Sequence, residues 1–219
     1  IRRANVGYSR RKADGEPGFA IDADSGRWLS RREAEEAIPD TAGLEEVGAR
    51  RAARVIPYVE DRRNALVVRL ARPVPSETIA TLQYALKRAI EATFDLEDSE
   101  LASEPLPSSR DRTAILLYES AEGGAGVLRR LIGEPDQLAA VAARALELLH
   151  YDPETGEDRG KADGAEERCE RACYDCLLSY TNQRDHGLLN RHLVIELLRT
   201  LTDAIVATGG QAASPEEEF

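Results

Sequence analysis

Apolar residues recur along the chain at two spacings, one typical of helices and the other of strands. After Pro75, apolar positions follow one another at intervals of three and four, which places them on one face of a helix that Ser76 can cap. These positions are Ile79, Leu82, Leu86, Ile90 and Phe94. Similar stripes over residues 136–149 and 193–205 predict two more helices, each with one buried face.

Three runs rich in β-branched and other apolar residues predict strands. Residues 113–118 form a continuous apolar run, typical of a central strand buried on both faces. Residues 55–59 and 65–70 are separated by a polar turn, and we expect them to pair as a hairpin.

The order of strand, helix, strand, glycine turn and helix predicts an α/β fold in which helices pack on a mixed sheet. We expect five parts along the chain. They are a β-rich, basic N-terminal segment (1–54), an α/β core (55–150), a flexible loop (151–167), a small helical, zinc-binding subdomain (168–208) and a disordered acidic tail (209–219).

The composition of the 219 residues, 42% hydrophobic and 32% charged, is that of a globular protein and excludes collagen-like and wholly disordered classes. No apolar run is long enough to cross a membrane, so we expect a cytoplasmic protein without a membrane partner. The chain contains no methionine and begins without a signal sequence, and we interpret it as an internal piece of a longer protein.

The net charge of −11 is unevenly distributed. Residues 1–72 carry +3 (15 Lys and Arg against 12 Asp and Glu), whereas the remainder carries −14 (14 against 28). Because nucleic-acid affinity depends on neutralising phosphates, the acidic total argues against a stand-alone nucleic-acid-binding protein. Any phosphate contact is expected in the basic stretch Arg2, Arg3, Arg10, Arg11 and Lys12.

All three cysteines, Cys169, Cys173 and Cys176, lie within eight residues. Thiolates spaced C-x3-C-x2-C can converge on one tetrahedral Zn²⁺, which predicts a structural zinc site in a segment too polar to pack alone. His186 is our first choice as fourth ligand, because it lies on a loop that can fold back. His150, His192, a carboxylate or water are the alternatives.

Other chemistries fit less well. A disulfide leaves one cysteine over, and a nucleophilic cysteine needs a matched histidine. The glycine-rich loop 122–126 could cradle phosphate or could be a tight turn, and Glu119 beside it opposes an anion. No serine-elbow, zinc-protease or kinase motif appears, so we expect no complete active site, and a hydrolase site around Glu119 and His186 is the minor alternative.

Several motifs resemble the C-terminal zinc-binding region of large bacterial superfamily 2 (DEAD/DEAH-box) helicases, similar to MrfA-type helicases and to the DISARM and Druantia anti-phage proteins. The matching runs are Ile56-Pro-Tyr-Val-Glu-Asp-Arg-Arg-Asn64, Leu117-Tyr-Glu-Ser-Ala-Glu-Gly-Gly-Ala-Gly-Val-Leu128 and Ala172-Cys-Tyr-Asp-Cys-Leu-Leu-Ser-Tyr-Thr-Asn-Gln-Arg-Asp-His186. Members related to MrfA are associated with four zinc-binding cysteines, whereas this chain has three.

The resemblance implies a non-motor domain that guides or shapes DNA in repair or anti-phage defence. ATP and Mg²⁺ would be bound by helicase motor domains N-terminal to this piece of the chain. Asn182, Gln183 and Arg191 match polar residues after the metal motif and are candidate nucleic-acid contacts. The alternative is an assembly module that docks other defence-system subunits without touching DNA.

Overall fold

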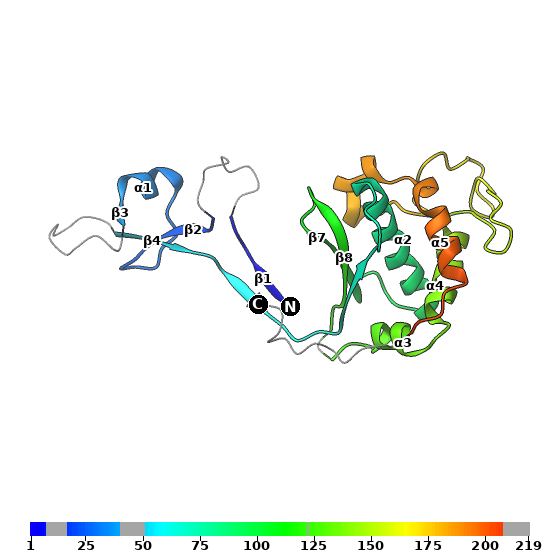
Figure 1. The fold of residues 1–219 in the computed structure, drawn as a ribbon. Coiled ribbons are helices and arrows are strands. Elements are labelled where there is room, and N and C mark those ends of the chain that lie inside the picture. Colours follow the sequence, from blue (N-terminus) through cyan, green and yellow to red (C-terminus); the bar gives the residue numbers. More distant parts are fainter. Residues whose placement is uncertain (8–16, 40–50, 122, 208–219) are drawn as a thin grey trace. The chain divides into compact units, whose positions relative to one another are not determined.

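The computed structural model describes residues 1–7, 17–39, 51–121 and 123–207. The chain divides into two compact units between Arg62 and Arg63 (Figure 1). The predicted acidic tail, 209–219, lies outside the described residues.

The first unit consists of small β elements and one short helix. Strand β2 pairs antiparallel with β4, β4 pairs parallel with β3, and β1 pairs antiparallel with β5. Ser30 and Glu33 form a reciprocal capping box that fixes the start of α1. The elements are β1 (Arg2–Ala4), β2 (Phe19–Asp22), α1 (Arg31–Glu36), β3 (Ile38–Pro39), β4 (Arg51–Val55) and β5 (Tyr58–Glu60).

The expected hairpin between residues 55–59 and 65–70 is wrong. Strand β5 pairs with β1, whereas β6 (Ala65–Arg69) pairs with β8 (Arg112–Glu119) in the second unit. The pairing with β8 sets Leu66 opposite Leu117 and Val68 opposite Ile115, on the face that carries the core. Strand β5 is exposed along its length, so a hairpin with it would bury little apolar surface.

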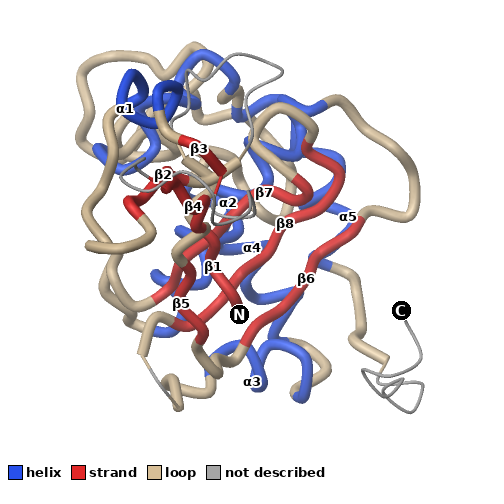
Figure 2. The backbone as a smooth tube through the Cα atoms, turned by 90° about the vertical axis from the view of Figure 1, so that its left-hand side faces the viewer, coloured by secondary structure: helices blue, strands red, loops and turns tan. Residues whose placement is uncertain are grey.

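The sheet of the second unit is antiparallel, with the order β6-β8-β7, where β7 spans Leu101–Pro107 (Figure 2). Strand β8 is central, as predicted, and Ile115 and Leu117 are buried on its core face. The opposite face is only partly covered, because Leu116 is half-buried and its partner Val67 is 46% exposed. The strand is therefore not buried on both faces along its whole length.

The predicted helices pack on one side of this sheet, which confirms an α/β arrangement of helices on a sheet. Helix α2 lies against β7 and β8, α4 lies beyond α2, and α5 packs against α4 (Figure 1). Helix α2 begins directly after Pro75, and its apolar stripe is almost fully buried. The helices are α2 (Ser76–Phe94), α3 (Val127–Gly133), α4 (Gln137–Leu148) and α5 (Ile195–Thr202).

The cysteine-containing segment joins this same core. Cys169, Cys176 and Leu177 belong to one buried cluster with the apolar faces of α2 and α4. Two 3₁₀ helices, η1 (Tyr180–Leu188) and η2 (Arg191–Val194), lead from the cysteines to α5. The small C-terminal zinc-binding part is thus built onto the helical layer.

The segment 151–167 contains no helix or strand, as expected of a loop, but its backbone is organised by specific hydrogen bonds. The carboxylate of Asp152 accepts from the amides of Glu154 and Thr155, which closes a tight turn. An isolated β bridge joins Tyr151 to Asp158 at the two ends of this turn.

Candidate metal centre

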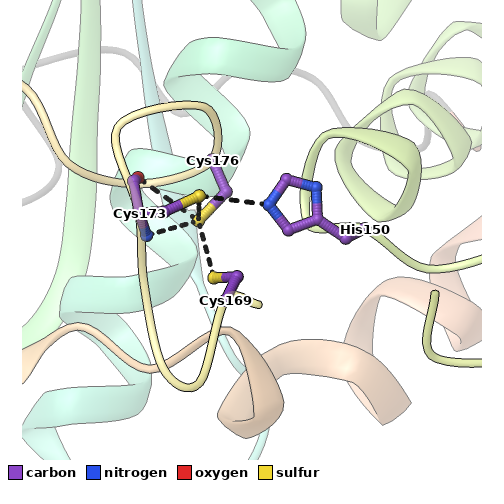
Figure 3. Close-up of side chains that lie close together, drawn as sticks. All are labelled: His150, Cys169, Cys173 and Cys176. Carbon is purple, nitrogen blue, oxygen red and sulfur yellow. Dashed lines mark hydrogen bonds between the residues drawn. The ribbon is translucent and has the colours of Figure 1, made fainter. Parts of the chain in front are cut away.

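Four side chains from two segments of the chain converge in the second unit: His150, Cys169, Cys173 and Cys176 (Figure 3). His150 follows the last residues of α4 and adopts a left-handed backbone conformation with φ = 65°. This conformation ends the helix, and the imidazole points toward the cysteine loop (Figure 3).

The cysteines lie on a tight loop whose backbone forms hydrogen bonds within the loop, including one to the sulfur atom of Cys176. The carbonyl of Cys173 accepts from the amides of Cys176, Leu177 and Leu178. The amide of Cys173 donates to Sγ of Cys176 at 3.0 Å. These bonds turn the chain so that the Sγ atoms face inward (Figure 3).

Helix α2 holds this loop from outside. The guanidinium of Arg88 donates to the carbonyl of Tyr174 at 3.0 Å and to that of Cys176 at 2.6 Å. The amide of Cys169 donates to the carbonyl of Gly160 at 2.8 Å, which fixes the other end of the loop. The three cysteines are therefore positioned by contacts outside the cluster as well as within it.

The distances within the cluster fit a tetrahedral zinc ion. Sγ of Cys176 lies 3.7 Å from Sγ of Cys169 and 3.5 Å from Sγ of Cys173, and Nε2 of His150 lies 3.2 Å from Sγ of Cys173. Zn–S bonds of about 2.3 Å at tetrahedral angles place sulfur atoms about 3.8 Å apart. A disulfide requires about 2.05 Å, and all three cysteines are free. The geometry thus favours a Cys₃His metal site over a disulfide.

Burial favours the neutral, protonated form of the cysteines as long as no cation is bound. Burial raises the pKa of the Cys176 thiol far above its usual value, and it raises that of Cys169 as well. Burial and the positive charge of Arg191 lower the pKa of His150, which keeps its imidazole neutral, as a metal ligand must be. A bound Zn²⁺ would supply the charge that stabilises the thiolates, and its binding would release their protons.

The structure differs from the sequence prediction at the fourth ligand. His150 stands beside the cysteines, whereas Nε2 of His186 lies 3.0 Å from the carbonyl of Ser179 and 2.9 Å from Oδ1 of Asn182. His186 thus belongs to the hydrogen bonds of η1. The sequence signal for His150 is its position directly after an amphipathic helix, but the 18 residues between it and Cys169 match no familiar zinc-finger spacing. The other alternative, His192, is hydrogen-bonded to Tyr151 and to the carbonyl of Glu170.

Two of the three candidate nucleic-acid contacts after the metal motif point inward. Asn182 is 4% exposed, and its amide nitrogen donates to the carbonyl of Leu177. Arg191 is 2% exposed and forms an ion pair with Asp158. These two side chains hold the fold and are not available to bases or phosphates, whereas Gln183 is exposed.

The basic stretch at the N-terminus is only partly described. Arg2 and Arg3 lie on strand β1 and are exposed. Arg10, Arg11 and Lys12 lie outside the described residues.

The glycine-rich loop is occupied by the protein's own carboxylate. Glu119, which is 2% exposed, accepts from the amides of Gly126 at 3.0 Å and Leu128 at 2.9 Å, and from Nδ2 of Asn64 at 2.9 Å. Burial alone would raise the pKa of Glu119, but these hydrogen bonds lower it overall. An added Cβ at Gly124 would lie 1.7 Å from Oε2 of Glu119. The loop is therefore a tight turn around a buried carboxylate, which leaves no room for phosphate and engages Glu119 in structure.

Among the described residues, no helix is long and apolar enough to cross a membrane. Comparison with curated proteins gives no match, and comparison with solved structures gives none. Residues 82–177 match the family model described as the MrfA Zn-binding domain. That range includes all four residues of the cluster, so the match and the geometry agree on the metal. The match and the cluster together support a MrfA-type zinc-binding domain within this chain.

Proposed function

We propose that this chain is the zinc-binding accessory part of an ATP-dependent DNA helicase, and that it guides DNA for motor domains located elsewhere in the same protein. The observation that carries the proposal is the largely buried Cys₃His cluster within the stretch that matches the MrfA zinc-binding domain. The zinc is structural in this proposal, because all four ligand positions are filled by side chains and no position is left for a substrate.

Exposed basic groups that could contact a DNA backbone lie on the ribbon of β1 and β5. Arg2 lies 4.9 Å from the ring of Tyr58 and forms an ion pair with Glu60, and all three side chains are exposed. An exposed pair of this kind stabilises the fold by no more than about 1 kcal/mol, so phosphate can compete for the guanidinium. Tyr58, 59% exposed, offers a ring on which a base can stack.

The test is salt-dependent DNA binding by the full protein, with its motor domains. Replacing Arg2, Arg3, Arg10, Arg11 and Lys12 with alanine should weaken binding, and the dependence of log K on log[salt] should flatten by about 0.7 to 0.9 for each phosphate that the variant no longer neutralises. The control replaces Arg31 and Arg32 with alanine, because these arginines are also exposed and ion-paired but lie on α1, outside the basic stretch. DNA binding that is undiminished in the fivefold variant would contradict the proposed contact.

An assembly module is the second candidate function, because large apolar side chains of the first unit are exposed to solvent and could bind a partner protein. Among the described side chains of this unit none is buried, and Trp28, Tyr58 and Val59 are each more than half exposed. The net charge of −11 for the whole chain suits docking on a basic partner. Co-purification with another subunit at low salt that is lost at high salt, together with DNA binding unaffected by the fivefold substitution, would favour this function.

A further inference from the structure

Arg191 is one of the largest fully buried side chains in the described part of the protein. A buried guanidinium is costly unless nearly all its N–H groups are paired. Its two terminal nitrogens donate to the two carboxylate oxygens of Asp158 at 2.7 and 2.8 Å, a bidentate pair. The guanidinium carbon also lies 4.9 Å from the ring centroid of Tyr151.

The remaining donors of Arg191 reach the two chain segments that supply the metal ligands. Nε donates to the carbonyl of Cys169 at 3.0 Å, and Nη1 donates to the carbonyl of Leu149, the residue before His150, at 3.2 Å. One planar group therefore fixes the backbone at one cysteine ligand and next to the histidine ligand. Within the cluster, the described contact between these two segments is that of Nε2 of His150 with Sγ of Cys173.

Asp158 extends the same network. Its Oδ1 accepts from the amide of Gly160 at 2.8 Å, and the carbonyl of Gly160 accepts from the amide of Cys169. The amide of the next residue, Arg159, donates to the carbonyl of His150 at 2.9 Å. Both partners of the ion pair thus hold the backbone of His150 relative to that of Cys169.

We propose that Arg191, paired with Asp158, is the positioning residue of the metal centre. It fixes the position of the His150 imidazole relative to the three cysteine sulfur atoms. This role rests on the proposed zinc site and goes beyond it, because it names a residue that is not a ligand but holds the ligand segments in place. The planar fork is essential to the role, since four bonds in fixed directions are needed and the ammonium of lysine cannot provide them.

A second buried arginine provides the matched control. Arg112 pairs with Asp185 at 2.7 Å, with side chains 1% and 17% exposed, and its other described partners are Gln83 and the carbonyl of Ser109. None of these partners is a ligand or a neighbour of a ligand in the sequence. Arg112→Lys should therefore lower stability as Arg191→Lys does, without reaching the metal.

The experiment measures Zn²⁺ affinity by competition with a chromophoric chelator, and coordination from the absorption spectrum of the Co²⁺-substituted protein. We expect Arg191→Lys to weaken zinc binding by about 10- to 100-fold, the range seen for groups that orient metal ligands, and to alter the Co²⁺ ligand-field bands. Asp158→Asn should act in the same direction with a smaller effect. Arg112→Lys should leave both the affinity and the Co²⁺ spectrum unchanged while lowering the melting temperature.

A double-mutant cycle tests whether Arg191 acts through His150. In a His150→Asn background, Arg191→Lys should weaken zinc binding far less than it does in the wild-type background, because the ligand it positions is gone. Wild-type affinity and spectrum in Arg191→Lys, equal losses in Arg112→Lys, or full additivity in the cycle would each overturn the proposal. If Arg191→Lys does not fold, Asp158→Asn decides, and an unchanged affinity and spectrum in that variant would refute the role. A wild-type protein that contains no zinc would instead refute the metal centre itself.

Discussion

Replacing His150 should cost the protein most of its zinc affinity, whereas replacing His186 should cost none. The backbone at His150 has φ = 65°, a region that alanine adopts only with strain and asparagine tolerates well. The substitution of choice is therefore His150→Asn, which removes the imidazole without adding backbone strain to the measurement.

The expected loss of zinc affinity is estimated by dividing the free energy of zinc binding among the four ligands. Four-ligand structural zinc sites bind with about 10 to 16 kcal/mol, or about 2.5 to 4 kcal/mol for each ligand. Each 1.4 kcal/mol is a factor of ten, so loss of one ligand weakens binding by about two to three orders of magnitude. Water can enter the vacated position, which favours the lower end of this range.

His186→Ala is the matched control, because it removes a histidine from the same region and breaks contacts with Ser179, Asn182 and the ring of Tyr174, none of which is in the cluster. It should reduce stability by about 1 kcal/mol for a lost hydrogen bond and leave the zinc dissociation constant unchanged. The assay is competition of each purified variant with a chromophoric chelator, with zinc content measured by elemental analysis. Zinc affinity that falls in His186→Ala and persists in His150→Asn would refute the assignment of the fourth ligand.

Three further outcomes are expected. Cys173→Ser should release about one equivalent of zinc and increase hydrogen exchange between residues 167 and 191, while the central strand stays protected; a variant that retains its zinc would contradict the site. Glu119→Gln should destabilise the protein in urea unfolding and should remove a pH dependence. Because the pKa of folded Glu119 is lowered, its contribution is complete above the unfolded pKa and is lost as pH falls through the folded value, so wild type and variant should converge in acid. Leu117→Ala, at a fully buried position of the central strand, should lower the free energy of unfolding by about 2 to 5 kcal/mol, and a loss below 1 kcal/mol would contradict its place in the core.

The sequence predicted elements whose partners are close in the chain or whose apolar stripes are long. Helix α2 and strand β8 were found because the burial of residues such as Leu86 and Ile115 follows the period of the element itself. Pairing between distant strands leaves no such periodic signal, so the partner of residues 65–69 was assigned to the nearest strand in the sequence, whereas the true partner begins at Arg112.

In the candidate site, too, contacts between segments that are distant in the sequence could not be predicted. Three cysteines within eight residues predict a metal site, but the fourth member of the cluster, His150, comes from the end of a helix that only the fold brings alongside. Arg191 was predicted to contact DNA from the resemblance to helicase domains, because a sequence does not distinguish a buried arginine from an exposed one. Its burial and its pairing with Asp158 depend on a loop that carries no apolar pattern.

The cysteines lie in the same buried cluster as the faces of α2 and α4, and this placement links the stability of the domain to the zinc concentration around it. A site assembled from a helix end and a distant loop does not exist in the unfolded chain, so zinc binds the folded state preferentially. Above the dissociation constant, each tenfold rise in free zinc then adds about 1.4 kcal/mol to the free energy of unfolding. The folded fraction of the domain is consequently a function of zinc availability, and a cell that buffers zinc at a lower level would hold less of the protein in its folded form.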